Sequence, residues 1–260
     1  MTSISELFSL SGKRAIVTGG GVGLGLQFAT GLAEAGADVV LCGRNEERCI
    51  EAANAIAQAH GVRAIGVRCD VRDPDSVNAV VATAVEQLGG VDILVNNAGA
   101  SWGAPTEEFP LDGWNKVMTV NVTGSWLFAQ AVGRHLVEAG RPGRIINLSS
   151  VLALQGVKAG SVDAIAYNTS KGAVISMTRD LAVKWAPKGI TVNAIAPGWF
   201  PSDMSNVSLE KNNESFLGRI PMGRFGSDDD LKGLAVFLAS DAAAYVTGQT
   251  ILVDGGLGVS

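Results

Sequence analysis

Residues 14–25 of the chain read RAIVTGGGVGLG, and an amphipathic segment of helical spacing follows over residues 24–35. The run Arg14–Thr18 is short, apolar and bounded by glycine, which is typical of a buried strand. A glycine turn between a strand and a helix directs backbone N–H groups and the positive helix end at one point, where a phosphate can bind. Gly19, Gly23 and Gly25 give the spacing G-x-x-x-G-x-G instead of the common G-x-G-x-x-G, and a tight turn without a ligand remains the alternative.

The same alternation of short apolar runs and longer amphipathic stretches continues along nearly the whole chain. The apolar runs predict strands at 14–18, 38–42, 64–69, 93–96, 144–148, 191–194 and 250–253. The amphipathic stretches predict helices at 24–35, 46–59, 74–88, 111–139, 164–186 and 229–240. Strands that are apolar on both faces and separated by helices predict an α/β fold, a doubly wound parallel sheet of about seven strands with helices on both faces. We expect one domain over residues 1–260.

Residues 198–226 are the least regular part of this pattern. They are rich in Ser, Asn, Gly and Pro, and a long irregular segment inside a compact domain is typical of a binding loop. We therefore expect a flap over the site. Its large apolar side chains are Trp199, Phe200, Met204, Phe216, Leu217 and Met222.

The composition excludes several classes of protein. Apolar residues make up 47% of the 260 residues and charged residues 17%, so the chain is not disordered, and a net charge of −5 argues against nucleic acid or an anionic membrane as the main partner. Three cysteines without a C-x-x-C pair and only two histidines predict neither a disulfide framework nor a metal site. The first residues do not resemble a signal peptide and no long apolar run occurs, so we expect a cytoplasmic protein.

The end of the second predicted strand bears on the choice of nucleotide. A dinucleotide site needs a group for the adenosine ribose about 20 residues beyond the glycine turn. No acidic residue, which would select NAD, stands there; Arg44 does, and its guanidinium suits the 2′-phosphate of NADP. We expect NADP rather than NAD, the alternative being a solvated arginine at the start of a helix.

Tyr167 and Lys171 form a second candidate constellation. They are four residues apart in a predicted helix and therefore share a face. An adjacent ammonium favours the phenolate, which would bring Tyr167 toward the pH range in which it exchanges a proton with a carbonyl oxygen. Ser149 and Ser150 follow the strand 144–148 at the sheet edge where doubly wound folds bind ligands. The alternative is a core tyrosine beside a surface lysine.

Together these motifs resemble the short-chain dehydrogenase/reductase family. The resemblance runs from Gly12 to Gly256 in the family's order, and it implies a Rossmann-type oxidoreductase that needs no metal. The residues that carry it are Thr18–Gly25, Asn96–Gly99, Asn121, the serine after the fifth strand, Tyr167, Lys171, Pro197 and Gly198.

The resemblance implies four catalytic residues. Tyr167 would donate a proton to the carbonyl in reduction and accept it in oxidation. Lys171 would lower the pKa of Tyr167 and hold the nicotinamide ribose, and Ser150, rather than Ser149, would hydrogen-bond the reacting oxygen. Asn121 would hold a water that links Lys171 to solvent, or its amide would pair with backbone at a helix distortion.

It also implies contacts along a bound dinucleotide. Asp70, with Val71 beside the ring, would accept a hydrogen bond from the adenine amino group. Pro197 and Gly198 would lie against the nicotinamide, and Ser202 would bind its carboxamide. Val22 stands where many NADP-dependent members carry a basic residue. The predicted cofactor contacts are Gly19, Gly23, Leu24, Gly25, Arg44, Asp70, Val71, Asn97, Ala98, Gly99, Lys171, Pro197, Gly198 and Ser202.

Within the family, the chain is most similar to the 3-oxoacyl (β-ketoacyl) reductase linked to rhamnolipid synthesis, and less so to gluconate 5-dehydrogenases. The stretches that carry this similarity are 98–104, 113–118, 196–204 and 220–226. We therefore expect a 3-oxoacyl or related carbonyl reductase. The alternatives are a sugar-acid or polyol dehydrogenase and, more remotely, a nucleotide-binding regulator without catalysis. Members that act on an acyl carrier protein bind it through two basic residues; Arg141 matches one of these positions, but Val183 occupies the other. This weakens the prediction of a carrier-bound substrate, and a coenzyme A thioester or a free ketone is an alternative.

The expected substrate pocket includes a short insertion within 155–163, since Ser150 and Tyr167 are farther apart than in many members. The apolar flap suits an apolar substrate, although its side chains could instead close over the nicotinamide. The predicted substrate contacts are Trp102, Gln155, Trp199, Phe200 and Met204. The resemblance further implies a homotetramer built on the helices 111–139 and 164–186 and the last strand.

Overall fold

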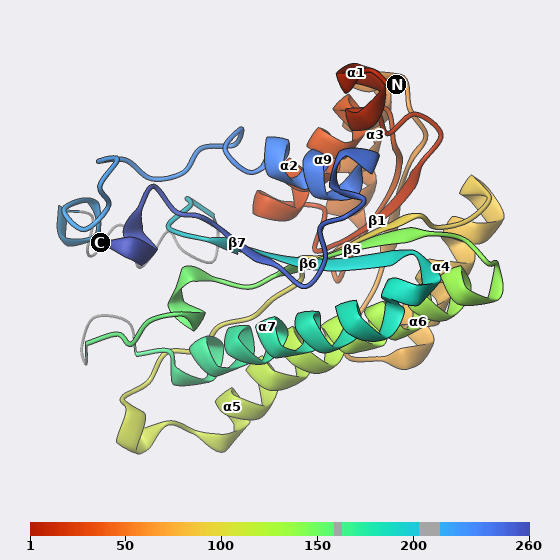
Figure 1. Ribbon diagram of the computed structural model, residues 1–260. Helices are drawn as coiled ribbons and strands as arrows, with labels where there is room; N and C mark the ends of the chain where they lie inside the picture. Colours follow the sequence, from red (N-terminus) through yellow and green to blue (C-terminus); the bar gives the residue numbers. More distant parts are fainter. Residues whose placement is uncertain (159–162, 203–213) are drawn as a thin grey trace.

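In a computed structural model, which describes residues 1–158, 163–202 and 214–260, seven strands form one parallel sheet in the order β3-β2-β1-β4-β5-β6-β7 (Figure 1). Every neighbouring pair is parallel, as expected for strands that are buried on both faces. The predicted doubly wound sheet is thereby confirmed. The strands are β1 (Arg14–Thr18), β2 (Asp38–Gly43), β3 (Ala64–Arg68), β4 (Ile93–Asn96), β5 (Gly143–Leu148), β6 (Ile190–Pro197) and β7 (Thr250–Val253).

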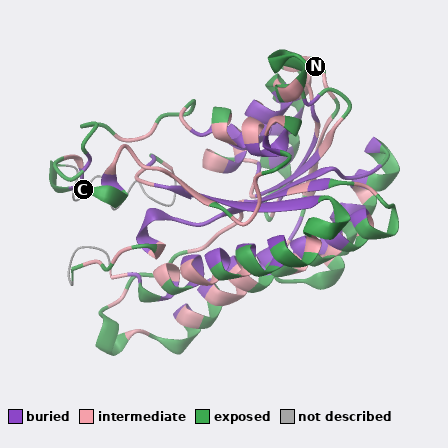
Figure 2. Ribbon diagram, in the orientation of Figure 1, coloured by how far each residue is buried: buried purple, intermediate pink, exposed green. Residues whose placement is uncertain are grey.

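Helices cover both faces of the sheet (Figure 1). One face carries α1 (Ile4–Phe8), α2 (Gly23–Glu34), α3 (Glu46–His60) and α9 (Lys232–Ala239). The other carries α4 (Pro74–Leu88), α5 (Leu111–Met118), α6 (Gly124–Glu138) and α7 (Ile165–Trp185). Two apolar cores result, one around Phe28 and Leu32 and the other around Phe128 and Leu136, and both lie where Figure 2 shows buried residues between helices and sheet. No described helix is both long and apolar enough to cross a membrane.

The predicted helix 111–139 contains a distortion in its middle. A π-helical turn, Thr119–Thr123, joins α5 to α6, and Asn121 lies in it. The predicted helix 229–240 is shorter than expected and begins only at Lys232, while β6 extends beyond 191–194 at both ends. Helix α1 was missed, although Ser3 and Glu6 form a capping box, which is a recognisable start signal in sequence.

The strand order reverses between β1 and β4, and this reversal positions the site. The chain passes from β1 to β2 on one side of β1, whereas β4 pairs with the other side of β1. Such a switch point leaves a crevice at the carboxyl ends of the two strands. The glycine turn after β1 and the segment 97–100 after β4 border this crevice.

The contact between β3 and α3 gives a test of the packing. A Cβ on Gly66 would collide with the backbone of Cys49 and Ile50, whereas one on Gly233 would meet nothing within 4 Å. We expect Gly66→Ala to lower the free energy of unfolding by about 1–3 kcal/mol, because the helix must move off the strand. Gly233→Ala should change it by less than about 1 kcal/mol and in the stabilising direction. Urea unfolding of both variants measures this, and equal effects would contradict the packing described.

Candidate active site

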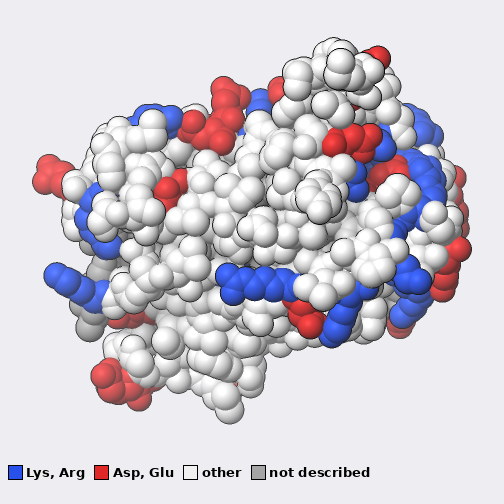
Figure 3. Space-filling model, in the orientation of Figure 1, with Lys and Arg blue, Asp and Glu red and all other residues white. Residues whose placement is uncertain are grey.

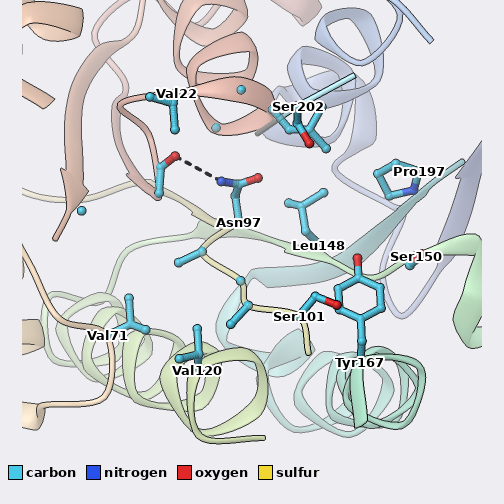
Figure 4. Close-up of a pocket in the computed structure, with 18 of the residues that line it drawn as sticks. Val22, Val71, Asn97, Ser101, Val120, Leu148, Ser150, Tyr167, Pro197 and Ser202 are labelled. Carbon is cyan, nitrogen blue, oxygen red and sulfur yellow. Dashed lines mark hydrogen bonds between the residues drawn. The ribbon is translucent and has the colours of Figure 1, made fainter. Parts of the chain in front are cut away.

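A cavity of about 740 Å³ lies along the carboxyl edge of the sheet, from the glycine turn to Tyr167 (Figure 4). Its wall contains five basic residues and one acidic residue among the described residues, so it attracts anions although the chain as a whole is acidic. Most predicted site residues contribute to it: Gly19, Gly23, Leu24, Gly25, Arg44, Asp70, Val71, Asn97, Ala98, Gly99, Ser150, Tyr167, Lys171, Pro197, Gly198, Trp199, Phe200 and Ser202.

The glycine turn is built so that only glycine fits at its key positions. Gly19 and Gly23 have φ of +64° and +54°, a conformation that side chains with a Cβ rarely adopt. A Cβ on Gly25 would collide with the carbonyl oxygen of Gly19. No described side chain caps the N-terminus of α2, and the first residues of that helix, Gly23 to Gly25, line the cavity. The turn therefore has the geometry of an anion site.

Thr18 and Asn97 fasten this turn to the end of β4. The Thr18 hydroxyl oxygen accepts hydrogen bonds from the backbone N–H groups of Asn97 (3.0 Å) and Ala98 (2.9 Å). In return, the Asn97 side-chain amide donates to the carbonyl oxygens of Thr18 (2.9 Å) and Gly19 (3.3 Å), and Figure 4 shows the amide reaching across. The two loops that border the crevice are thus held as one unit.

At the opposite end of the turn, basic side chains surround the ends of β2 and β3. Arg44 is exposed at the cavity wall, and Arg48 and Arg72 also line it. Arg72 binds both carboxylate oxygens of Asp70, the shortest contact being 2.6 Å, and lowers the pKa of Asp70 to about 2. Asp70 is therefore an ionised acceptor, but one that Arg72 already engages.

Tyr167 projects from α7 into the cavity, with its hydroxyl directed toward the end of β5 (Figure 4). Burial raises the pKa of Tyr167, and a hydrogen bond with the Ser150 side chain opposes that shift. Ser149 points away and donates to the backbone carbonyl of Lys171 at 2.9 Å. The structure therefore places Ser150, and not Ser149, beside the phenol.

Lys171 lies beneath Tyr167, with its Nζ 5.6 Å from the centre of the tyrosine ring and donating to the Leu148 carbonyl oxygen at 2.7 Å. Burial lowers the pKa of Lys171 to about 8. The expectation that the ammonium brings Tyr167 toward neutral pH is not met in the protein alone, because the loss of hydration dominates both groups. At pH 7 the lysine is charged and the phenol holds its proton.

Asn121 holds the floor of the cavity from the π-helical turn. Its Oδ1 accepts from the backbone N–H of Ala100 (2.7 Å), and its Nδ2 donates to the carbonyl of Ala100 (3.0 Å) and to the Ser170 hydroxyl (2.9 Å). The extra residue of a π turn aims this side chain inward, as such turns do at functional sites. Asn121 thus pairs with backbone at a helix distortion and lies beside the cavity without lining it.

The substrate end differs most from the sequence-based expectations. Trp199 stacks on Phe216 (centroids 4.2 Å apart), and Phe200 is 5% exposed, so these rings pack mainly against protein. Trp102 and Gln155 do not line this cavity, and the Trp102 ring lies against Gly113; their contact with a substrate stays a prediction.

Met204 lies outside the described residues, as does the part of the predicted insertion at 159–162. Sequence reasoning missed several cavity residues: Arg48, Cys49, Cys69, Arg72, Ser101, Lys116 and Val120. The only available signal was proximity to recognised motifs, for example Val120 next to Asn121.

Comparison with known proteins places this architecture among oxidoreductases. A family model described as enoyl-(acyl carrier protein) reductase matches residues 20–258. Gluconate 5-dehydrogenase of Gluconobacter oxydans is 42% identical over 98% of both chains, and the rhamnolipid biosynthesis 3-oxoacyl-[acyl-carrier-protein] reductase of Pseudomonas aeruginosa is 40% identical over 96% of this chain and 97% of its own.

Solved structures agree with the sequence relatives. A short-chain type dehydrogenase/reductase from Mycobacterium marinum superposes with a TM-score of 0.95 at 37% identity, covering 99% of this chain and 100% of the other. A gluconate 5-dehydrogenase from Burkholderia cenocepacia, solved in complex with NADP and tartrate, gives a TM-score of 0.93 at 38% identity with the same coverage.

The buried ammonium of Lys171 predicts how stability depends on pH. Its pKa is about 8 in the folded protein and 10.5 ordinarily, so between these values the unfolded chain holds a proton that the folded protein has released. Stability should therefore rise with pH from about 8 to 10, by up to about 1.4 kcal/mol per pH unit from this group. Thermal unfolding of the wild type and Lys171→Met without nucleotide measures it. The same slope for the two proteins would contradict the lowered pKa of Lys171.

Proposed function

This chain belongs to the short-chain dehydrogenase/reductase family, and we propose that it is an NADP-dependent oxidoreductase that interconverts a secondary alcohol and a ketone. One observation carries the proposal: the phenol of Tyr167, with Ser150 and Lys171 beside it, opens into the same cavity as the glycine turn. A proton-transfer group and an anion cradle in one cavity suit a reaction in which a dinucleotide and a carbonyl lie side by side.

The residues of the cavity fit NADP. The glycine turn and the α2 N-terminus would hold the pyrophosphate. Strand β2 ends at Gly43, and Arg44 follows it where an acidic residue would select NAD. Arg44 and Arg48 in the wall suit a 2′-phosphate, and the Burkholderia relative was solved with NADP. A bound NADP supplies the nicotinamide carbon that gives or receives the hydride.

The chain's own groups would supply the proton. Because the Tyr167 phenol is protonated at neutral pH, it can donate its proton to the carbonyl oxygen while Ser150 donates a hydrogen bond to the same oxygen. In the oxidative direction the phenolate would accept the proton, and the nearby Lys171 ammonium would stabilise that anion. Asn121 would keep Ala100 and the floor of the cavity in place.

For the substrate we propose a sugar acid of the gluconate type, which reverses the order expected from sequence. The gluconate 5-dehydrogenases of Gluconobacter oxydans and Burkholderia cenocepacia favour this order, and two of the aromatic rings that suggested an apolar substrate, Trp199 and Phe216, stack on each other. Arg141, the candidate for binding an acyl carrier, pairs with Asp92 at 2.8 Å just before β5, at the edge of the sheet opposite the cavity.

We also propose that the chain forms a homotetramer. Large apolar side chains are exposed on the helices α5, α6 and α7, and the face seen in Figure 3 carries few charges over its centre. Those exposed on these helices are Leu111, Trp126, Val137, Ile165 and Val183. A light-scattering mass near that of one chain, 26.8 kDa, would contradict it.

The two adjacent serines give a matched pair of variants. We expect Ser150→Ala to lower kcat by about 10²–10³-fold, because the reacting oxygen loses a hydrogen-bond donor. Ser149→Ala should leave kcat within a few fold and cost about 1 kcal/mol of stability, because it loses only the bond to the Lys171 carbonyl. Steady-state kinetics and urea unfolding measure these effects, and the reverse pattern would contradict the assignment of Ser150.

A panel of substrates tests the function itself. Gluconate with NADP⁺ and 5-ketogluconate with NADPH should be turned over, and Tyr167→Phe should lose about 10²–10⁴-fold in kcat while still binding NADPH. The panel should include 3-oxoacyl thioesters and diketones, each also with NADH. Preferred turnover of a thioester would replace the sugar acid, whereas tight NADPH binding without turnover of any carbonyl would point to a regulator.

A further inference from the structure

Lys116 is a basic side chain in the cavity wall to which the proposed function gives no task. It lies on α5, and its side chain is exposed. Three of the other basic residues in the wall, Arg44, Arg48 and Arg72, follow β2 and β3, and Lys171 lies under Tyr167. Lys116 is therefore a cation of the cavity that belongs neither to the adenosine end nor to the proton-transfer group.

The position of Lys116 is supported by Trp102. A Cβ on Gly113 would come within 2.8 Å of the Trp102 ring, so glycine at this position lets the ring lie flat against α5. Lys116 is one turn further along the same face, and its Nζ lies 5.1 Å from the centre of that ring. No carboxylate of the described residues forms an ion pair with Lys116. The ammonium is thus held in place and remains able to bind an anion.

The loop 97–104 connects this ammonium to the reacting groups. Its residue Gly99 lies against them, since a Cβ there would be 3.9 Å from Lys171 Nζ and 3.6 Å from Asn121 Oδ1. Trp102 is three residues after Gly99, and three residues of extended backbone span at most about 11 Å. Because Lys116 and Tyr167 line the same cavity, a short open-chain molecule with one carbon at Tyr167 can extend toward Lys116.

We propose that Lys116, supported by the Trp102 ring, binds the carboxylate of the sugar-acid substrate and so makes the enzyme prefer acids to neutral polyols. The inference rests on the proposed function and deepens it. In gluconate the carboxylate and the C5 carbon are separated along the chain, so one molecule can engage Lys116 and Tyr167 together. Lys116 acts here as a specificity-determining residue and takes no part in proton transfer.

Gluconate and its neutral analogue gluconamide give the test. In the wild type, kcat/KM for gluconate should exceed that for gluconamide, and Lys116→Gln should reduce this preference about tenfold or more, mainly through KM. Lys116→Arg should retain most of the preference, and Trp102→Leu should lose part of it. KM for NADP⁺ should not change.

Lys188→Gln is the matched control, because Lys188 is an exposed lysine just before β6, at the opposite edge of the sheet. It should leave both substrates unaffected. A second readout is calorimetric binding of gluconate to Tyr167→Phe saturated with NADP⁺, in which Lys116→Gln should weaken binding to the same extent. This measurement does not depend on turnover.

The outcomes separate the inference from the function on which it rests. If the wild type oxidises gluconate and Lys116→Gln has the same preference, or loses both substrates equally, the role of Lys116 is overturned and the proposed function stands. If the wild type neither binds nor oxidises gluconate or another sugar acid but reduces a 3-oxoacyl thioester, the proposed substrate fails and the inference fails with it.

Discussion

The hydrogen bonds between Thr18 and Asn97 are the constraint on which the site depends. They join the ends of β1 and β4, the two strands between which the order of the sheet reverses. Because Asn97 also binds the Gly19 carbonyl, the same bonds fix the glycine turn that leads into α2. Thr18 is buried and Asn97 is half-buried, so these hydrogen bonds hold the two strand ends together without a ligand. The cavity follows from how the two strand ends are joined.

The second element of the site is organised from the other side of the crevice. Asn121 binds both backbone groups of Ala100, so the segment that starts at Asn97 is held at its two ends. Ser170, which also binds Asn121, lies on α7 next to Lys171. The loop after β4 thereby links the glycine-turn end of the cavity to the end that contains Tyr167.

Sequence reasoning could predict the parts of this account that depend on local pattern. Strand β1, the glycine turn and the pair Tyr167 and Lys171 are close in the chain, and their chemistry is visible in residue type and spacing. It could not predict that Arg72 engages Asp70 or that Trp102 lies on Gly113 below Lys116. These contacts depend on side-chain directions in loops, which no periodicity encodes. The expected pKa of Tyr167 was wrong for a related reason, since burial is a property of the folded whole.

In the proposed reaction, a hydride passes directly between a nicotinamide and a substrate carbon in this cavity, and Tyr167 donates or accepts the proton. The most direct measurement is the fate of label from NADPH in which both hydrogens at C4 of the nicotinamide are deuterium, supplied with 5-ketogluconate. We expect gluconate that carries deuterium on the newly formed C–H bond, with the hydroxyl proton derived from solvent. Reduced product without carbon-bound deuterium, or no reduced product from any ketone of the panel, would contradict the proposed reaction.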